Sequence, residues 1–299
     1  MQADCPKQKE RRDYDAVAAF YDACTTPLTD AFGARAIDLL DVQPGHRVLE
    51  VTCGSGTLLP ELARRVGPTG AVTGLDQSSG MLALARGRLA RLGLEATTRL
   101  VQADAEHVPL APASYDRVLS VFGLMYMPRP LAALRGIKTA LRPGGRAAIC
   151  VWGLPESVAG LALPMEAGAR VLARPPVNWF VRTGLGRRLL YQQLLSDKLG
   201  GGKSPMSLAP RGLLERLMAA SGFTNLRREE PSRIFMYRDV EGYWEVLMGT
   251  PARVLLEQYP AATRARARAE IVRLLDERHR SPDGRLAVPM GSVIVTGHA

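Results

Sequence analysis

The chain has 299 residues, of which 46% are hydrophobic and 23% charged, and its formal net charge is +10. This length suits one large domain or two small ones, and the apolar content indicates a globular protein with a real core. No stretch approaches the ~18 apolar residues of a membrane span, and the polar N-terminus lacks the apolar run of a signal peptide, so we expect a cytoplasmic protein.

The N-terminal region is predicted to be helical. Residues 13–41 carry apolar side chains at helical spacing, among them Val17, Phe20 and Tyr21. Because they precede the first predicted strand, we expect residues 1–46 to form a helical cover.

A strand followed by a small-residue turn, Val48–Gly56, comes next. The strand carries Glu50, the turn contains Gly54 and Gly56, and a second carboxylate, Asp76, ends the next strand 26 positions after Glu50. Glycine has no Cβ and so lets a ligand approach the backbone closely. Asp76 is then placed to accept hydrogen bonds from a ribose diol, and the segment predicts a nucleoside site.

The glycine spacing separates two kinds of nucleoside cofactor. A dinucleotide fingerprint needs a third glycine, where this chain has Leu59. No basic residue lies between Glu50 and Glu61, and a pyrophosphate prefers a helix N-terminus without a carboxylate beside it. Glu50 instead suits a cofactor with a cationic amino acid end, such as S-adenosylmethionine.

Strands and helices alternate through the core. We expect strands near 47–52, 71–75, 98–102, 115–121 and 146–152, with helices near 57–66, 79–92 and 129–141. This alternation predicts a parallel sheet with helices on both faces. Ligands bind at the carboxyl ends of such strands, where five predicted site residues fall: Glu50, Gly54, Asp76, Asp104 and Ser120.

The second half divides differently. Residues 153–206 are rich in Pro and Gly and too long for a bare loop, which predicts a lid with helices near 157–173 and 184–199. A helix at 210–221, a strand near 225–237, a helical insertion and a strand at 292–297 follow. We therefore divide the chain into a cover at 1–46, a cofactor-binding core at 47–152, a lid insertion at 153–206, and the rest of the sheet at 207–299 with a helical insertion at 239–285.

Most of the excess positive charge lies in residues 151–299, densest from Arg264 to Arg273. These arginines alternate with alanines, which favours a solvated helix face; an acidic substrate or peripheral contact with an anionic membrane stays open. No basic motif with interleaved aromatic residues indicates nucleic-acid binding. The four cysteines show no CxxC pair and no metal-ligand spacing, so we expect reduced thiols and no metal site. The oligomeric state is not indicated.

Landmarks in the core carry a family resemblance. After the glycine loop come Leu75-Asp76-Gln77-Ser78, Met81-Leu82, Ala103-Asp104-Ala105, Ser120-Val121-Phe122 and Leu141-Arg142-Pro143-Gly144-Gly145. In this order, residues 48–152 resemble the class I S-adenosylmethionine-dependent methyltransferases, and in particular the ubiquinone/menaquinone-biosynthesis C-methyltransferases. The resemblance implies an α/β fold with a Rossmann-like seven-stranded, mostly parallel sheet that has an antiparallel edge strand.

The same resemblance assigns site residues. It implies that Asp104 and Ala105 meet the adenine edge, that Ser120 to Phe122 line the methionine side, and that Tyr21 covers the cofactor. Packing for Tyr21, a turn for Asp104 and a strand-end cap for Ser120 remain alternatives. The expected cofactor-binding set is Tyr21, Glu50, Thr52, Gly54, Ser55, Gly56, Asp76, Gln77, Met81, Asp104, Ala105, Ser120, Val121 and Phe122.

Two positions depart from the family pattern. Thr52 stands where the family usually has Gly; a β-branched residue narrows the site and is poorly suited to a glycine conformation, so we expect Thr52 in ordinary β geometry. Tyr126 stands where many relatives carry His near the transferred methyl group. We take it as the catalytic candidate, an acceptor-orienting phenol or weak base, with a role in lining the pocket as the alternative.

The sequence therefore predicts a methyltransferase that acts on a small, fairly apolar acceptor, such as a quinone, a phenol or a secondary metabolite, at a C, O or N atom. The lid and the insertion at 239–285 are expected to wall the acceptor site. A protein that binds S-adenosylmethionine without transfer is the alternative, because Thr52 alters the loop and no base is evident. A nicotinamide-dependent oxidoreductase is third.

Overall fold

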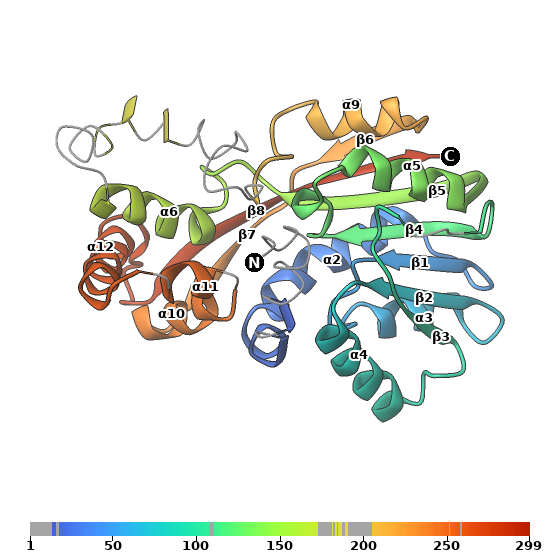
Figure 1. The fold of residues 1–299 in the computed structure, drawn as a ribbon, viewed down its shortest axis with the longest axis horizontal. Helices are drawn as coiled ribbons and strands as arrows, with labels where there is room; N and C mark the ends of the chain where they lie inside the picture. The colour runs from blue at the N-terminus through green and yellow to red at the C-terminus, as the bar shows by residue number, and fades with distance from the viewer. Residues whose placement is uncertain are drawn as a thin grey trace, which may run out of the picture.

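A computed structural model describes residues 14–15, 18–107, 111–172, 181, 183, 185–186, 189–190, 205–250, 252–257 and 259–299. It shows two lobes side by side (Figure 1). One contains the sheet with helices on both faces; the other, which we call the helical lobe, contains α6, α10, α11 and α12. The helix expected near 184–199 lies almost entirely outside the described residues.

Among the described residues, the sheet has eight strands in the order β3-β2-β1-β4-β5-β8-β6, with β7 paired to β8 off this path. Strands β1 to β5 are mutually parallel, and β8 runs antiparallel to both β5 and β6. The predicted mostly parallel Rossmann-like sheet is confirmed, with eight strands among the described residues rather than the expected seven and with the antiparallel strand, β8, between β5 and β6. The strands are β1 Arg47–Val51, β2 Ala71–Asp76, β3 Thr98–Gln102, β4 Tyr115–Val121, β5 Leu141–Trp152, β6 Thr224–Glu229, β7 Ser232–Tyr237 and β8 Leu286–His298.

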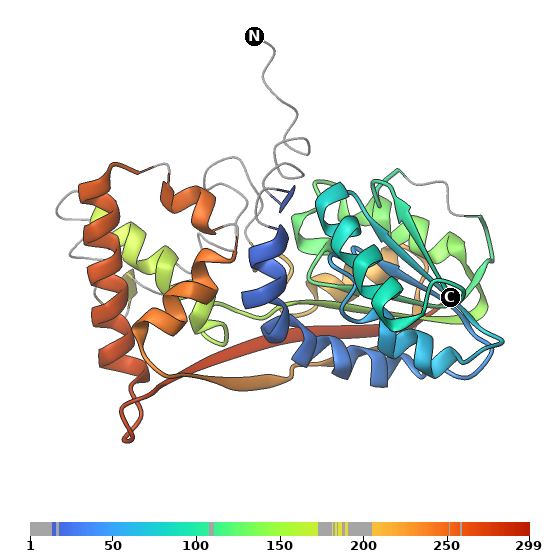
Figure 2. The same ribbon diagram turned by 90° about the horizontal axis from the view of Figure 1, so that it is seen from below.

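Helices cover the sheet on both sides, with α2 on one face and α5 on the other (Figure 2). Their ends follow from local chemistry. Ser78 caps α4 by accepting a hydrogen bond from the Met81 N–H at 3.0 Å, and Gly93 ends it in the left-handed conformation. The helices of this lobe are α2 Thr26–Leu40, α3 Leu59–Val66, α4 Ser79–Leu92, α5 Pro130–Ala140, α9 Leu213–Ala220 and the 3-10 helix η1 Leu124–Tyr126.

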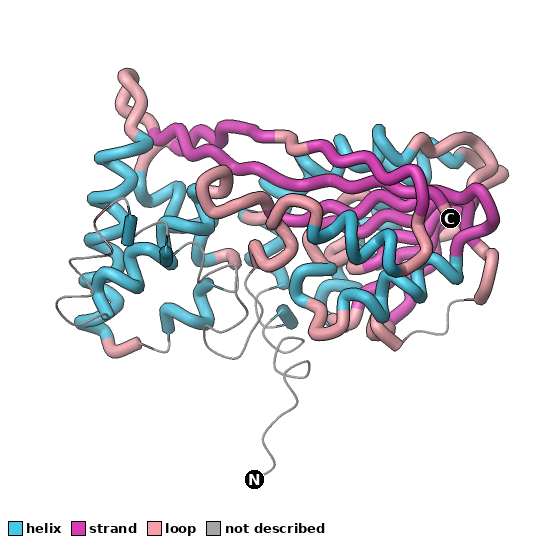
Figure 3. The backbone as a smooth tube through the Cα atoms, turned by 90° about the horizontal axis from the view of Figure 1, so that it is seen from above, coloured by secondary structure: helices cyan, strands magenta, loops and turns pink. Residues whose placement is uncertain are grey.

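The sheet is connected to the helical lobe by a two-stranded ribbon that consists of β7 and the first half of β8. The second half of β8 pairs with β5 and β6, whereas its first half, Leu286–Gly291, pairs with β7 and extends beyond the sheet toward the helices (Figure 3). The lobe has its own core, in which Leu163, Tyr243 and Leu274 are buried together. Its helices are α6 Ala159–Leu172, α10 Val240–Met248, α11 Ala252–Glu257 and α12 Ala261–His279.

Two strand predictions need correction. The single strand expected near 225–237 is divided into β6 and β7 at Glu230-Pro231, because proline has no N–H for the ladder. The last strand begins at Leu286 rather than Ser292, since its first half pairs with β7. The arginine-rich helix is confirmed as α12: it buries Ala267, Ile271, Leu274 and Leu275 and leaves its arginines largely exposed.

Cys53 and Cys150 are buried free thiols, and Cys24 is partly exposed. Among the described residues, no helix has both the length and the apolar character that crossing a bilayer requires.

Candidate functional site

A cavity opens at the carboxyl ends of β1, β2 and β4, and we call it the rim cavity. Eleven of the sequence-predicted site residues line it: Tyr21, Thr52, Gly54, Asp76, Gln77, Met81, Asp104, Ala105, Val121, Phe122 and Tyr126. Four others, Glu50, Ser55, Gly56 and Ser120, lie behind or beside its wall rather than on it. Residues far apart in the sequence therefore meet where a parallel sheet of this kind binds ligands.

Gly54 and Asp76 form the floor of the rim cavity. Gly54 has φ +52°, and a Cβ added to it would meet no atom within 4 Å, so its open side admits a ligand. Its N–H donates to Asp76 Oδ2 at 2.9 Å, and the Ser78 N–H donates to Oδ1 at 2.9 Å. Burial raises the pKa of Asp76, while these backbone donors favour its ionised form. The loop thus holds the Asp76 carboxylate at the end of β2.

Glu50 lies beneath this floor with only 2% of its surface exposed. Its Oε2 has no hydrogen-bond partner among the described residues. Burial raises the pKa of Glu50 well above its usual value, and the nearby carboxylates of Asp30 and Asp76 raise it further. Burial likewise raises the pKa of Asp30, which accepts a hydrogen bond from Thr57 Oγ1 at 2.7 Å. Three carboxyl groups therefore lie close together here, and a cationic ligand group would stabilise their ionised forms.

Gly56 and Ser55 have structural roles in the loop after β1. A Cβ on Gly56 would lie 2.9 Å from both Ala85 Cβ and Leu59 Cδ1, and its φ is +73°. The glycine is thus required for packing the loop against α4 and for the turn, in addition to any ligand approach. Ser55 Oγ donates to Asp22 Oδ1 at 2.5 Å and so holds the N-terminal segment.

Thr52 contradicts the expectation of ordinary β geometry, because its φ is +65°. The chain must turn sharply after β1 so that the Cys53 N–H can donate to Leu75 O at 2.9 Å, and this turn places Thr52 in the left-handed region. Gly123 makes room for the side chain: a Cβ on Gly123 would lie 2.1 Å from Thr52 Oγ1 and 2.5 Å from its Cβ. Buried Ser120 flanks it, with the two hydroxyl oxygens 3.4 Å apart.

Three tyrosines line the rim cavity. Tyr14 meets Tyr21 edge-on, with ring centroids 5.9 Å apart, and meets Tyr126 edge-on at 6.3 Å. Burial is the largest cause that raises the pKa of Tyr21, so it remains a neutral phenol. Tyr21 and Tyr126 both line the cavity, and the role of Tyr21 as a cofactor cover stays a prediction. Tyr14 was missed because an isolated tyrosine near the N-terminus carries no motif.

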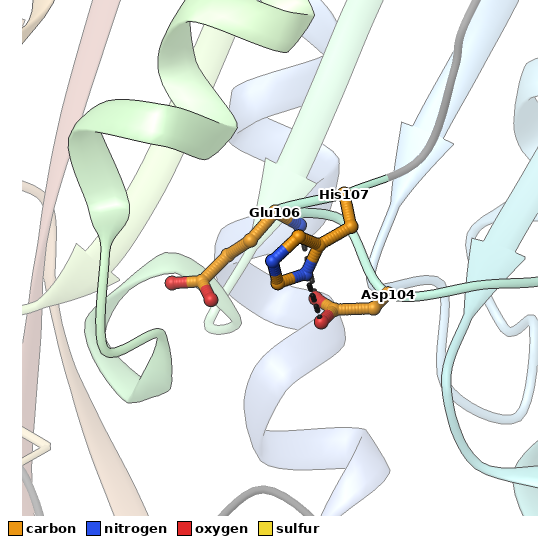
Figure 4. Close-up of side chains that lie close together, drawn as sticks. All are labelled: Asp104, Glu106 and His107. Carbon is orange, nitrogen blue, oxygen red and sulfur yellow. Dashed lines mark hydrogen bonds and ion pairs between the residues drawn. The ribbon is translucent and has the colours of Figure 1, made fainter.

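Asp104 belongs to a polar network at the opposite wall (Figure 4). His107 Nδ1 lies 2.7 Å from Asp104 Oδ2, and its Nε2 contacts Arg129 Nη2. Because the arginine can only donate, Nε2 accepts and Nδ1 carries the proton that Asp104 receives as a hydrogen bond. Asp104, Glu106 and His107 are close enough to hold a metal ion together. The Arg129 guanidinium already supplies a positive charge there. The backbone N–H of Arg129 donates a hydrogen bond to Glu106 Oε1.

A second cavity lies between the two lobes, and we call it the interlobe cavity. It shares Tyr14, Tyr21, Phe122 and Tyr126 with the rim cavity. Its remaining described lining comes from α2, β5, α6, β7, α10 and β8, together with two threonines outside these elements: Thr25, Leu28, Trp152, Gly160, Leu161, Tyr237, Tyr243, Val246, Leu247, Thr250 and Met290. The two cavities therefore meet at a common aromatic wall.

Several rim-cavity residues escaped sequence reasoning. Ser78 lies in a predicted landmark and could have been found from its capping position. The others are apolar or turn residues that reach the cavity only through packing: Leu75, Ala103, Gly123, Met127 and Pro128.

Comparison with known proteins agrees with this geometry. Residues 48–145 match the family model described as a methyltransferase domain. This part of the chain is a class I methyltransferase domain. The methyltransferase domain is also similar to the ubiquinone/menaquinone biosynthesis C-methyltransferase of Pseudomonas savastanoi pv. phaseolicola, which is 35% identical over 154 residues. That match covers 50% of this chain and 60% of the relative, so the chain spans less than two thirds of the length of the curated protein.

Solved structures show the same fold over a longer stretch. The cyclase SpnF has a TM-score of 0.54 and 18% identity, covering 90% of this chain and 80% of its own. A putative methyltransferase from Bacillus halodurans has a TM-score of 0.53 and 13% identity, covering 89% of this chain and 97% of its own. At these identities the likeness shows the fold of the methyltransferase domain and its surroundings alone.

Proposed function

We propose that this protein transfers a methyl group from S-adenosylmethionine to a small, fairly apolar acceptor. The observation that carries the proposal is the pair of cavities that meet at Tyr14, Tyr21, Phe122 and Tyr126. A methyltransferase must bring a donor and an acceptor together at one place and exclude water from it. A cofactor in the rim cavity and an acceptor in the interlobe cavity would meet at this shared wall.

The rim cavity fits the cofactor on its own chemistry. The open side of Gly54 leaves room at the backbone, and Asp76 at the end of β2 suits a ribose diol. The unpartnered oxygen of buried Glu50, with Asp30 nearby, suits the positive charge of an amino acid end. A dinucleotide would bring a negative pyrophosphate toward the same carboxylates, which disfavours the nicotinamide oxidoreductase.

When bound, S-adenosylmethionine supplies a methyl group on a positively charged sulfur. The residues of this chain contribute alignment: Asp76 and Gly54 hold one end, and the shared aromatic wall holds the acceptor in line. Effective molarities of ~10⁵–10⁸ M are within reach of well-oriented groups. Tyr21 and Tyr14 exclude water, and Tyr126 orients the acceptor from η1. Among the described residues that line the interlobe cavity, no strong base is present to receive a proton that leaves the acceptor.

The nature of the acceptor follows from two sources. The interlobe cavity is walled by residues of α6 and α10, which belong to the predicted lid and to the insertion at 239–285. The curated relative is described as a C-methyltransferase of quinone biosynthesis. A quinone-like or phenol-like ring methylated at carbon is therefore the acceptor that we favour within the proposal, with O- or N-methylation of a similar ring as the variant.

Binding of S-adenosylmethionine without methyl transfer is the second candidate. It is favoured by the strained backbone of Thr52 in the cofactor loop and by the lack of a strong base among the described residues of the interlobe cavity. A protein of the same fold, SpnF, is described as a cyclase, so the fold alone does not decide. Loss of the donor methyl group during turnover with a phenol or quinol distinguishes the two candidates.

Calorimetry with S-adenosylmethionine, S-adenosylhomocysteine and NAD tests the cofactor assignment. We expect the first two to bind and NAD not to bind. Asp76→Ala should weaken binding by about 1.5–3 kcal/mol, the scale for a hydrogen bond to a charged group. Asp283→Ala, in the turn before β8, is the matched control and should change nothing. Unchanged affinity in Asp76→Ala would remove the basis of the assignment.

A further inference from the structure

The described lining of the interlobe cavity is uncharged and rich in aromatic side chains. Seven of its described lining residues are aromatic, and none of the described ones is Asp, Glu, Lys, Arg or His. A charged acceptor entering it would lose its hydration without gaining an ion pair, which is unfavourable by several kcal/mol. The described walls therefore favour a neutral molecule.

One wall is flat and rigid. Phe122 and Trp152 are stacked, with centroids 3.8 Å apart and planes 20° apart. The Phe32 ring packs edge-on against both, with its centroid 5.9 Å from that of Phe122 and 6.0 Å from that of Trp152. Aromatic rings pack best against flat faces and edges of other rings, so this wall suits a planar ring better than a branched aliphatic chain.

Tyr237, on β7, also lines the interlobe cavity and carries a hydroxyl group. The neighbouring Tyr243 hydroxyl already donates to Gly160 O at 2.8 Å, and Thr250 Oγ1 donates to Leu247 O at 2.7 Å. Tyr237 packs edge-on against Tyr243, with centroids 5.5 Å apart, and no hydrogen bond of its hydroxyl to another described residue is present. Burial raises the pKa of Tyr237 to about 12, so its hydroxyl keeps its proton and can donate.

We propose that the interlobe cavity binds a neutral, planar ring that carries an oxygen substituent, and that Tyr237 selects this acceptor by donating a hydrogen bond to the oxygen. The inference rests on the proposed function, because it takes the ligand of this cavity to be the methyl acceptor. It goes further by naming the charge state of the acceptor and one specificity-determining residue.

Three probes with the same ring frame separate these features: 2-naphthol, 2-naphthoate and naphthalene. Binding of each is measured by calorimetry in the presence of saturating S-adenosylhomocysteine. We expect 2-naphthol to bind at least tenfold more tightly than the anionic 2-naphthoate. Tyr237→Phe should weaken 2-naphthol about threefold to tenfold, the scale of one neutral hydrogen bond, and should leave naphthalene unchanged.

A variant that fills the cavity tests its location. Leu161 lines the interlobe cavity from α6, whereas Leu172, on the same helix, is 48% exposed and does not line it. Leu161→Trp should abolish binding of 2-naphthol and leave S-adenosylhomocysteine affinity within about twofold; Leu172→Trp, the matched control, should change neither. Val246→Phe, from α10, provides a second filling variant if Leu161→Trp fails to fold.

The outcomes distinguish this inference from the proposed function. If 2-naphthoate binds as well as 2-naphthol, or if both filling variants retain 2-naphthol binding, the inference is wrong whatever the cofactor does. If Tyr237→Phe weakens naphthalene and 2-naphthol equally, Tyr237 only shapes the cavity and does not select an oxygen. Failure of the wild-type protein to bind S-adenosylhomocysteine would instead overturn the proposed function, since 2-naphthol binding can be measured without it.

Discussion

At the scale of single residues, Thr52 and Gly123 form a complementary pair. Left-handed backbone costs a residue other than glycine roughly 1–2 kcal/mol, and Thr52 adopts it in the wall of the rim cavity. Its side chain occupies the space that a Cβ on Gly123 would need. The bulk of the Thr52 side chain is therefore accommodated because Gly123 has no side chain.

A double-mutant cycle tests this pairing. Gly123→Ala alone should lower the free energy of unfolding by about 1–3 kcal/mol, because it overpacks the wall against Thr52. Thr52→Gly alone should change stability little, since relief of backbone strain offsets the greater entropy of glycine in the unfolded chain, and should keep cofactor affinity within about tenfold, or ~1.4 kcal/mol. In the double variant the cost of the Gly123→Ala substitution should largely disappear.

Denaturant unfolding of the four proteins gives the coupling energy directly. We expect about 1–2 kcal/mol, within the range found for residues in contact. Simple additivity would mean that the two side chains do not compete for the same space. A large gain in cofactor affinity for Thr52→Gly would indicate a site adapted away from ordinary cofactor use.

At the scale of elements, the N-terminal segment is held over the rim cavity at two points. Asp22 accepts from Arg88 Nη2 at both carboxylate oxygens, at 2.9 and 3.0 Å, and from Ser55 Oγ at Oδ1. Asp15 accepts from Ser78 Oγ at 2.5 Å and from the Gly80 N–H at 2.9 Å at the start of α4. Ser55 lies in the loop after β1, Ser78 in the loop after β2, and Gly80 and Arg88 in α4, so the N-terminal segment is attached to elements that adjoin the rim cavity.

Asp22→Asn should therefore speed cofactor release. The variant loses the charge attraction to Arg88 and one acceptor for Ser55, so the cover opens more often; we expect the dissociation rate of S-adenosylhomocysteine to rise about threefold to tenfold, the scale of one or two such hydrogen bonds. Association should change less, since most affinity changes appear in the dissociation rate. Stopped-flow displacement measures both.

Asp38→Asn is the matched control. Asp38 forms an ion pair with Arg65 at 2.5 Å, also between the N-terminal helices and the core, but α2 and α3 meet there away from the rim cavity. This substitution should leave the release rate unchanged. Equal acceleration in both variants would show a general loosening of the N-terminal helices and would argue against the cover as a latch.

At the scale of the whole molecule, sequence reasoning reached the methyltransferase domain and stopped short of the interlobe cavity. Asp76 and Gly54 could be placed because a carboxylate or glycine at a strand end lies on the rim of a parallel sheet whatever surrounds it. The left-handed turn at Thr52 and the packing role of Gly56 depend on contacts with Gly123 and Ala85, which no local pattern reveals.

The interlobe cavity could not be predicted from the sequence for a related reason. Its walls come from segments more than two hundred residues apart, such as Tyr14 and Tyr243, and each is an ordinary apolar position in its own helix or strand. The ribbon of β7 and β8 extends from the sheet to the helical lobe, which lies beside it. The lid and insertion could be predicted as helical and as walls of an acceptor site, but the aromatic lining could not be predicted from them.

A buried network of ion pairs connects α6 and α12 within the helical lobe. Glu166 on α6 is fully buried and accepts from both Nη atoms of Arg278 on α12 at 2.9 Å, while Arg170 lies 2.5 Å away and also reaches Glu270. We expect Glu166→Gln to destabilise the helical lobe by about 3 kcal/mol, because it removes the carboxylate that pairs with partly buried Arg278 and one of the two that pair with buried Arg170. Glu257→Gln, in an exposed pair with Arg253, is the control and should cost under about 1 kcal/mol.

Hydrogen exchange read by mass spectrometry shows where the change falls. In Glu166→Gln, protection should drop in α6 and α12 and stay unchanged in β1, β2 and β4, since the sheet lobe has its own core. Binding of 2-naphthol should weaken at least fivefold, because α6 walls the interlobe cavity, whereas S-adenosylhomocysteine affinity should stay within about twofold. Equal loss of protection in both lobes, or equal loss of both ligands, would show that the molecule folds and binds as one unit and that cofactor and acceptor sites cannot be assigned to separate lobes.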